Sequence, residues 1–221
     1  MSSSAARKRP FVPILVTAIL LLIAGVVVVL AIANPFGEKT APAAVPVVAE
    51  NSHHLDEAPE GSITFVEFPD FACPACAAAA PVVEQLRTDY AGRVDFVQRY
   101  LPLPGHRNAE PAALAAEAAA QQGKLSEMTA VLFANQRAWG NAPDDRSADF
   151  RSMAEALELD MDAFDAAVAD PKTLERVNFD RDAAMDLGVK QTPSFFVDGE
   201  LLDGVGGYQD LAKALDAALA K

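Results

Sequence analysis

Short apolar runs bounded by glycine or proline alternate along this chain with long runs rich in alanine and leucine. The run 62–68 is β-branched and aromatic and lies between Gly61 and Pro69, which predicts a strand buried on both faces. The pair Asp198-Gly199 tolerates positive φ and predicts a tight turn between two further strands. The remaining strands are predicted at 94–100, 194–197 and 201–202.

The long runs place apolar residues at helical spacing and contain many strong helix formers. Asp170 and Pro171 are typical of an N-cap and a first helical position, and Gly188 is typical of a helix end. Strands on both sides of a helical block predict the α/β class, with a mixed sheet covered by helices. Helices are predicted at 77–80 continuing into 82–90, and at 108–122, 125–139, 147–157, 161–169, 171–187 and 208–220.

An uncharged apolar run occupies residues 11–33, which is 23 residues. At about 1.5 Å per residue this run can cross a hydrocarbon core of about 30 Å, so we expect one transmembrane helix. Arg7-Lys8-Arg9 precede it, and the positive-inside rule puts residues 1–10 in the cytoplasm and the rest of the chain outside the cell membrane. Ala31-Ile32-Ala33 is similar to a cleavage site, but cleaved signals have apolar regions of about 7–15 residues, which favours an uncleaved signal-anchor.

Residues 34–60 are rich in proline and alanine and predict an extended linker. His53 and His54 fall in this linker and are interpreted as solvated surface. The linker leaves residues 61–221 as the folded domain, and about 160 residues are enough for one stable core.

The charge balance is acidic, with 18 basic and 31 acidic residues in the whole chain. The first 33 residues hold three of the basic residues and none of the acidic ones, which leaves 15 against 31, or −16, on the remainder. Such a surface is a poor binder of nucleic acid, so no nucleic-acid partner is expected.

Cys73 and Cys76 are the only cysteines in 221 residues, and their spacing is C-x-x-C. Four interpretations compete: a redox-active pair, a metal site, a structural disulfide and an incidental pair. A disulfide across two residues removes little chain entropy, so it is a weak structural cross-link. A structural zinc site needs four ligands, and only His53, His54 and His106 could join the cysteines. The spacing favours a redox-active pair, and we expect neither a metal nor another cofactor.

The position of Cys73 supports this interpretation. It precedes a predicted helix, where free backbone N–H groups and the helix dipole favour an anion. A thiol in such a place has a pKa below about 8.5, and the thiolate is the reactive form.

Two segments resemble a known superfamily. Glu67-Phe68-Pro69-Asp70-Phe71-Ala72-Cys73-Pro74-Ala75-Cys76 resembles the strand and active-site turn of the thioredoxin superfamily, and Gln191-Thr192-Pro193-Ser194-Phe195-Phe196-Val197-Asp198-Gly199 resembles its cis-proline loop. Within the superfamily the chain is most similar to the DsbA-like thiol-disulfide oxidoreductases, particularly the membrane-anchored bacterial type. The resemblance covers roughly 61–221 and implies a thioredoxin fold with a helical insertion at about 107–170, preceded by the N-terminal transmembrane helix.

The resemblance assigns roles to the active-site turn. Cys73 is implied to be the sulfur that forms the mixed disulfide with a substrate, and Cys76 the resolving thiol. Pro74 and Ala75 form the turn between them. The best-known oxidising members carry histidine where this chain has Ala75, and an imidazolium there would stabilise the Cys73 thiolate, so a weaker oxidant is expected.

The resemblance also implies a substrate-binding loop and a buried acid. Thr192 and a cis Pro193 are expected to lie across from the cysteines and to pair with an extended substrate. Glu67 stands six residues before Cys73, where the superfamily places a buried acidic residue that exchanges protons with Cys76. A carboxylate at a strand edge that reaches water is the alternative for Glu67, and the apolar neighbours on both sides favour burial.

Four further residues have two interpretations each. Pro81 resembles the kink proline of the active-site helix, unless the helix ends near Ala80. His106 resembles a histidine common in these proteins, and a turn or helix-start role is favoured over catalysis. Phe133 and Trp139 either line a peptide groove or, as is more usual at helical spacing, belong to the core.

These observations lead to a hypothesis of function. We expect a membrane-anchored, extracytoplasmic thiol-disulfide oxidoreductase that oxidises cysteine pairs of exported proteins. The resemblance implies a quinone-linked membrane partner that reoxidises the cysteines. The alternatives are a disulfide reductase or isomerase with the same site, a non-catalytic binding or assembly module with a thioredoxin-like groove, and a metal chaperone.

Overall fold

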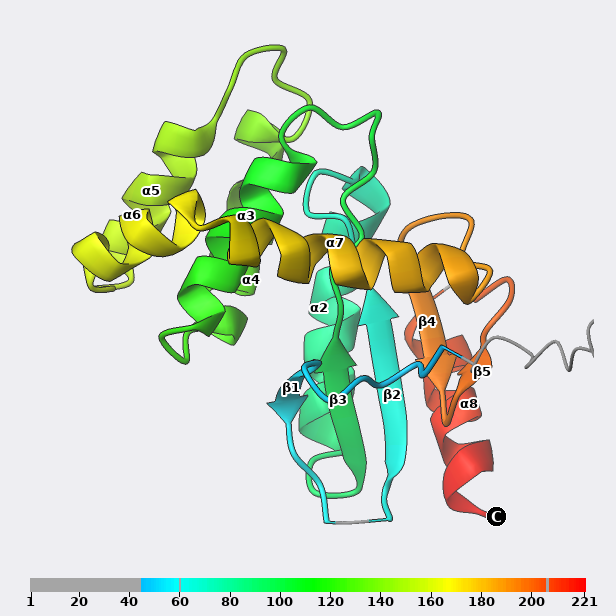
Figure 1. Ribbon diagram of the computed structural model, residues 1–221. Coiled ribbons are helices and arrows are strands. Elements are labelled where there is room, and N and C mark those ends of the chain that lie inside the picture. Colours follow the sequence, from blue (N-terminus) through cyan, green and yellow to red (C-terminus); the bar gives the residue numbers. More distant parts are fainter. Residues whose placement is uncertain (1–44, 60, 206) are drawn as a thin grey trace, which may run out of the picture. The chain divides into compact units, whose positions relative to one another are not determined.

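The computed structural model describes residues 45–59, 61–205 and 207–221 (Figure 1). The expected cytoplasmic segment 1–10, the expected transmembrane segment 11–33 and the first part of the expected linker lie outside the described residues. In the part that the structure describes, none of the helices combines the length and the hydropathy needed to cross a membrane.

A mixed five-stranded sheet forms the centre of the described chain, with the strand order β1-β3-β2-β4-β5. The two central strands β2 and β3 are parallel, and each outer pairing is antiparallel. The strands are β1 (His53–Asp56), β2 (Ile63–Phe68), β3 (Val94–Gln98), β4 (Ser194–Val197) and β5 (Glu200–Leu201). The expected turn at Asp198-Gly199 is confirmed, and both residues have positive φ, 50° and 84°.

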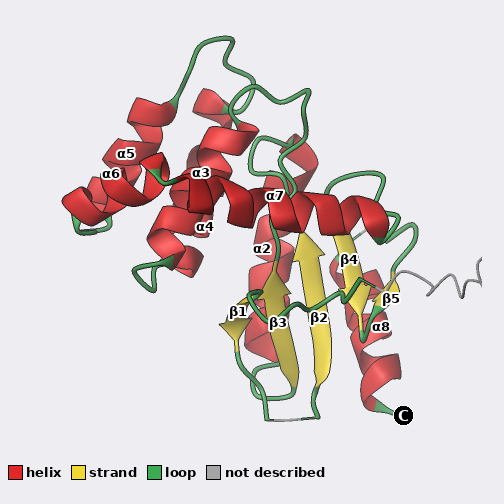
Figure 2. Cartoon of the chain, viewed as in Figure 1, coloured by secondary structure: helices red, strands yellow, loops and turns green. Residues whose placement is uncertain are grey.

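Helices lie behind the sheet and across its upper end in this view, and others form a second group beside it (Figure 2). The predicted helices are confirmed, with ends that differ by a few residues. They are α2 (Pro74–Asp89), α3 (Ala109–Ala120), α4 (Leu125–Trp139), α5 (Ser147–Ala156), α6 (Met161–Ala169), α7 (Pro171–Asp186) and α8 (Tyr208–Leu219). The helix α2 continues through Pro81, so the alternative that it ends near Ala80 is wrong.

The two faces of the sheet bury different side chains because successive residues of a strand point to opposite faces. Phe65 packs with residues of α2 and α8, including Leu86 and Leu215. Val66 and its neighbours on the other face pack with Ala184 near the end of α7. The strand β2 is therefore buried on both faces, as its composition predicted.

The helices α3 to α7 lie between β3 and β4 in the chain. The alanine-rich α3 is central to this group and contacts each of the other four helices. Alanine lets helices approach closely, and eight of the 12 residues of α3 are buried. Figure 1 shows α7 running from this group across the end of the sheet, so one helix joins the two parts of the core.

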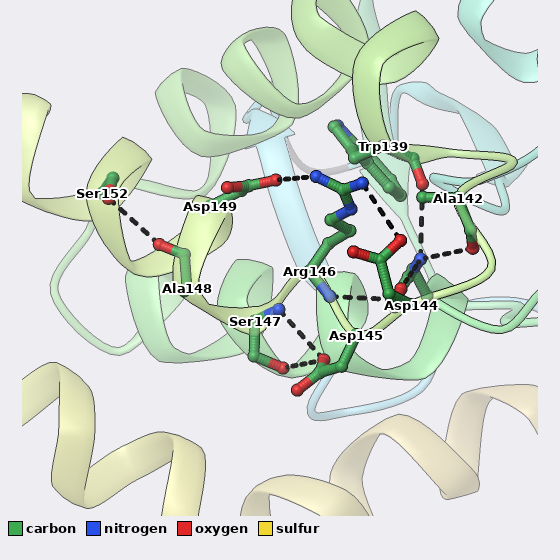
Figure 3. Close-up of polar contacts among 10 residues, drawn as sticks. Trp139, Ala142, Asp144, Asp145, Arg146, Ser147, Ala148, Asp149 and Ser152 are labelled. Atoms are coloured by element: carbon green, nitrogen blue, oxygen red, sulfur yellow. Dashed lines mark hydrogen bonds and ion pairs between the residues drawn. The ribbon is translucent and has the colours of Figure 1, made fainter.

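The loop between α4 and α5 is held by a network of polar contacts. The buried Asn108 amide donates to the carbonyl oxygens of Trp139, Ala142 and Asp144, at 3.1–3.3 Å, and accepts from the Arg146 N–H. Figure 3 shows the Arg146 side chain reaching toward two carboxylates, and its guanidinium donates to both Asp144 and Asp149. This loop fixes the chain just before α3.

The strand β1 corrects the expected linker at 34–60. Residues 53–56 pair with β3 instead of forming an extended tether. His53 and His54 are also not simply solvated, because His53 Nε2 lies 2.6 Å from Glu117 Oε2 and His54 Nδ1 lies 2.8 Å from Asp95 Oδ1. The segment has no alternating apolar pattern, so its strand depends on the free edge of β3 and on these two carboxylates.

A buried ion pair joins α7 to the end of β3. Arg99 Nε donates to Asp180 Oδ1 at 2.7 Å, and both side chains are fully buried. Arg176 forms a second contact with Asp180, at 2.6 Å. Arg99 also donates to the carbonyl oxygens of Pro46 and Val47, each at 3.0 Å, so the same guanidinium binds the segment that precedes β1.

We expect Asp180→Ala to lower the free energy of unfolding by roughly 3–5 kcal/mol, because it leaves the buried Arg99 without its counter-ion. Asp182→Ala is the matched control, since Asp182 is on the same helix and its contact with Arg181 is at the surface. That control should change stability by no more than about 0.5 kcal/mol. Equilibrium urea unfolding measures both, and equal effects of the two substitutions would contradict the assignment.

Candidate active site

The two cysteines stand at the beginning of α2. Cys73 is the N-cap residue, Pro74 takes the first helical position, and Cys76 lies in the first turn. Proline suits that position because its missing N–H would have no helical partner. Cys73 is 9% exposed and Cys76 is fully buried, so Cys76 lies deeper in the domain. Both are thiols in this structure.

The predicted cis-proline loop faces Cys73. The Thr192–Pro193 peptide bond is cis, as the resemblance implied. Cys73 Sγ lies 3.5 Å from the Thr192 carbonyl oxygen, although the two residues are 119 positions apart in the sequence. The antiparallel pairing of β4 with β2 brings them together, since Ser194 is opposite Phe68 in the register.

The environments of the two thiols push their pKa values in opposite directions. A hydrogen bond from Cys76 is the largest cause that lowers the pKa of Cys73 to about 5, and Thr192 and the N–H groups of Cys76 and Ala75 lower it further, against the effect of burial. Burial is the largest cause that raises the pKa of Cys76, followed by the hydrogen bond to Cys73 and the charge of Glu67. At neutral pH Cys73 is therefore the thiolate and Cys76 the protonated thiol.

Glu67 is buried, as expected, on the side of β2 that faces α2. Its side chain stands in the middle of the sheet, where Glu67 pairs in register with Gln98 and Phe195. Burial, with a smaller contribution from the charge of Glu84, raises the pKa of Glu67 to about 8. Within the described residues its Oε1 has no hydrogen-bond partner. The carboxyl is therefore mostly neutral at pH 7 and is able to exchange a proton near Cys76.

Asp70 and Gln136 hold the loop before Cys73, and neither was predicted from the sequence as a site residue. Asp70 Oδ1 accepts from the Ala72 N–H at 2.8 Å, and Gln136 Nε2 donates to the Ala72 carbonyl at 2.8 Å. The sequence offered a signal for Asp70, because a charged residue inside an apolar motif is unusual. It offered no signal for Gln136, because the role of Gln136 follows from the packing of α4 beside α2.

The structure also shows the surroundings of His106, Trp139 and Phe133, for which the sequence left two interpretations each. His106 is a turn residue whose Nδ1 lies 2.6 Å from Asp70 Oδ2. Trp139 belongs to the core, where its ring makes an edge contact with Phe150 at a centroid distance of 4.7 Å. Phe133 is partly buried and packs on Phe71.

Two grooves border the active-site turn. An apolar groove of about 280 Å³ has Ala75 and Pro193 at one end, and α2 and α8 form its sides. A more polar groove of about 380 Å³ lies between α2 and α4 and is lined by Pro74, Phe133 and Arg137. Within the described ranges, no group of three or more His, Cys, Asp or Glu side chains is placed to hold a metal ion.

A mixed sheet with a C-x-x-C turn at a helix N-terminus, facing a cis-proline loop, defines the thioredoxin fold class. The chain belongs to the thioredoxin family, because the family model described as thioredoxin matches residues 49–217.

Solved structures share this fold. A thioredoxin-like oxidoreductase from Silicibacter pomeroyi is 29% identical, with a TM-score of 0.67 over 82% of this chain and 99% of that chain. The thiol-disulfide exchange protein alpha-DsbA2 from Wolbachia pipientis is 25% identical, with a TM-score of 0.61 over 73% of this chain and 85% of that chain. These neighbours place the fold among the DsbA-like structures.

A longer curated relative is more similar in sequence. The Na(+)/H(+) antiporter NhaA 3 of Salinispora tropica is 40% identical over 177 residues, which is 80% of this chain. The chain spans 26% of the length of that protein.

We expect the thiolate absorbance of the reduced protein at about 240 nm to titrate with a midpoint near pH 5, because the Cys73 pKa is lowered to about 5. Cys76→Ala should move the midpoint to about pH 6, since a hydrogen bond to a charged group is worth roughly 1.5 kcal/mol. Cys76→Ser is the matched control, because its hydroxyl still donates to Cys73. A midpoint that is the same in both variants would show that the Cys76 hydrogen bond is not the cause.

We expect the Glu67 carboxyl to titrate near pH 8, and isotope-edited NMR of its side chain measures this directly. Below that pH the group is protonated and neutral, and above it the group is a carboxylate. Glu84→Gln should lower the Glu67 pKa, because it removes the neighbouring negative charge. Glu110→Gln, on α3, is the control and should leave the titration in place. An ordinary Glu67 titration near pH 4.5 would contradict its burial.

Proposed function

We propose that this protein is a thiol-disulfide oxidoreductase that oxidises cysteine pairs of exported proteins through Cys73 and Cys76. One observation carries the proposal: a thiol that is 9% exposed and has a lowered pKa lies 3.5 Å from the cis-proline loop, and the second thiol, one helical turn away, is fully buried and protonated. Two thiols with such different pKa values form an exchange pair, because the Cys73 sulfur leaves or attacks easily and the Cys76 sulfur stays protonated.

The oxidising reaction starts from the Cys73–Cys76 disulfide. A substrate thiolate attacks the Cys73 sulfur, a mixed disulfide forms, and Cys76 leaves with the electron pair and takes a proton. A second substrate thiolate then attacks the substrate sulfur of the mixed disulfide, and Cys73 leaves as a thiolate. The substrate has lost two electrons to the cysteine pair.

Each site residue has a role in this reaction. Thr192 and Pro193 present backbone groups beside Cys73, where an extended peptide can pair with them. Glu67 donates a proton to Cys76 as Cys76 leaves and takes the proton back when the pair is reoxidised, since its raised pKa is close to that of a group working at neutral pH. Pro74 and Ala75 keep the turn small and leave the Cys73 sulfur open to the substrate.

The lowered pKa of Cys73 supports the oxidising direction. A stabilised thiolate stabilises the reduced pair, and this makes the disulfide a better electron acceptor. The stabilisation here comes from Cys76, Thr192 and backbone N–H groups. It does not need the histidine that the best-known oxidising members carry at the position of Ala75.

The proposed location is the outer face of the cell membrane. The uncharged segment 11–33 would anchor the chain, with residues 1–10 in the cytoplasm and the cysteines outside. A quinone-linked membrane protein is the proposed partner that reoxidises the pair. The substrates would be cysteine-containing proteins that emerge on the same side.

A second candidate is a binding or assembly module that serves a membrane transporter. The sequence identity with the Salinispora tropica antiporter favours this candidate, because about a quarter of that longer protein is similar to this chain. In this function the groove would hold a partner and the thiols would be dispensable.

We expect Cys73 and Cys76 to be mostly oxidised in growing cells, and tagging of free thiols after acid quenching measures this state. Cys73→Ala should abolish oxidation of a two-cysteine peptide. Cys76→Ala should trap mixed disulfides with substrates, because the buried thiol that competes for Cys73 is gone.

The outcomes separate the candidates. A pair that is mostly reduced in cells would favour a reductase or isomerase. Full complementation of a disulfide-formation defect by the double variant Cys73→Ala with Cys76→Ala would favour the binding module.

A further inference from the structure

A second buried carboxylate lies beside the cysteines, and the proposed reaction does not use it. The Asp70 side chain is fully buried, and His106 is 28% exposed. Asp70 Oδ2 accepts from the Leu103 N–H at 3.0 Å and lies 2.6 Å from His106 Nδ1, while Oδ1 accepts from the Ala72 N–H at 2.8 Å. One carboxylate therefore connects the loop before Cys73 with the loop that leads into α3.

The backbone of the same residue contacts the buried thiol. The Asp70 N–H donates to Cys76 Sγ at 3.4 Å, and the Asp70 carbonyl accepts from the Cys73 N–H at 3.0 Å. The direction of that N–H depends on how residue 70 is held. Its side chain has three partners, and each of them limits the rotation of the peptide group.

His106 is itself held firmly. Its N–H donates to the Leu103 carbonyl, and its own carbonyl accepts from the Ala109 N–H, both at 3.0 Å. Asn108, two residues later, anchors the chain to the α4–α5 loop. Because His106 does not move freely, it is a fixed donor for the Asp70 carboxylate.

We propose that Asp70 and His106 form a positioning pair that keeps the Asp70 N–H directed at the Cys76 sulfur. This inference rests on the proposed function, because it matters only if Cys76 takes part in thiol-disulfide exchange. The N–H stabilises the Cys76 thiolate, which is the leaving group in the oxidising direction and the attacking group in the reverse direction. Neither Asp70 nor His106 contacts the reacting sulfur with its side chain.

The surroundings of Cys76 explain why such a donor is needed. Burial and the hydrogen bond to Cys73 both oppose a thiolate at Cys76, whereas the Asp70 N–H favours one. An N–H group supplies partial positive charge without adding a second titrating group beside Glu67. The pair therefore acts on the buried thiol and leaves the Cys73 thiolate to its own donors.

Reaction with 5,5′-dithiobis(2-nitrobenzoic acid) tests this step without a biological substrate. The Cys73 thiolate attacks the reagent, which releases one nitrothiolate and leaves a mixed disulfide on Cys73. Cys76 then loses its proton and attacks the Cys73 sulfur, which forms the Cys73–Cys76 disulfide and releases a second nitrothiolate. In stopped-flow measurements of the full chain, the rate of this second phase does not depend on reagent concentration.

We expect His106→Ala and Asp70→Asn to slow the second phase by roughly tenfold, because a hydrogen bond to a charged group is worth roughly 1.5 kcal/mol. The first phase and the Cys73 pKa should stay close to those of the wild type. His106→Asn should restore most of the rate, since its amide nitrogen stands near the place of Nδ1 and still donates to Asp70.

His54→Ala is the matched control. It removes another histidine–aspartate contact, of 2.8 Å, which lies on β1 and contacts β3. This variant should keep the wild-type rate of the second phase. A general loss of stability would change both phases, whereas the loss of positioning slows only the second.

Two results would be decisive. A wild-type second phase in folded His106→Ala and Asp70→Asn would overturn the positioning role and leave the proposed function intact. If His106→Ala does not fold, a rate for Asp70→Asn equal to that of the wild type has the same meaning. The absence of a second phase in the wild type would instead overturn the exchange reaction itself.

Discussion

Charged groups enter the core at the ends of β2 and β3, and each of them requires a partner from the helices. Arg99 pairs with Asp180 of α7, and the Asp70 carboxylate lies against His106 just before α3. An unpaired charge in these positions would cost several kcal/mol, so the sheet and the helical group cannot separate without a large penalty. The Asp70 carboxylate also fixes the loop that precedes Cys73. The geometry of the active site therefore depends on how these charges are satisfied.

The difference between the two cysteines follows from this packing. Cys73 stands at the open end of α2, where hydrogen bonds stabilise its thiolate. Cys76 is one turn further along, where burial and the hydrogen bond to Cys73 keep it protonated. Over three residues of helix the exposed fraction of the cysteine falls from 9% to zero. Chemically identical side chains become different reagents because the helix places them at different depths.

Elements with strong local signals were predicted well. Pro171 after an N-cap aspartate marks the start of α7, and the Asp170 side chain accepts from the Lys172 N–H as expected. Asp198-Gly199 marks the β4–β5 turn for a similar reason, since few residues adopt positive φ readily. The strand β1 was missed, because its sequence His53-His54-Leu55-Asp56 has no alternating pattern. It exists because β3 offers a free edge and because Glu117 and Asp95 accept contacts from its histidines.

The candidate reactive groups are already visible in the amino-acid sequence: two cysteines in a C-x-x-C turn at a helix start, a proline loop near the other end of the domain, and an acidic residue in a buried strand. These signals are local, and a few neighbouring residues define each of them. Only the tertiary structure decided which groups surround the cysteines. Thr192, Gln136 and Asp70 reach the active-site turn through strand pairing, helix packing and a buried carboxylate. Contacts between distant segments depend on the whole core, because burial and hydrogen bonding choose the partner, and no short stretch of sequence carries that information.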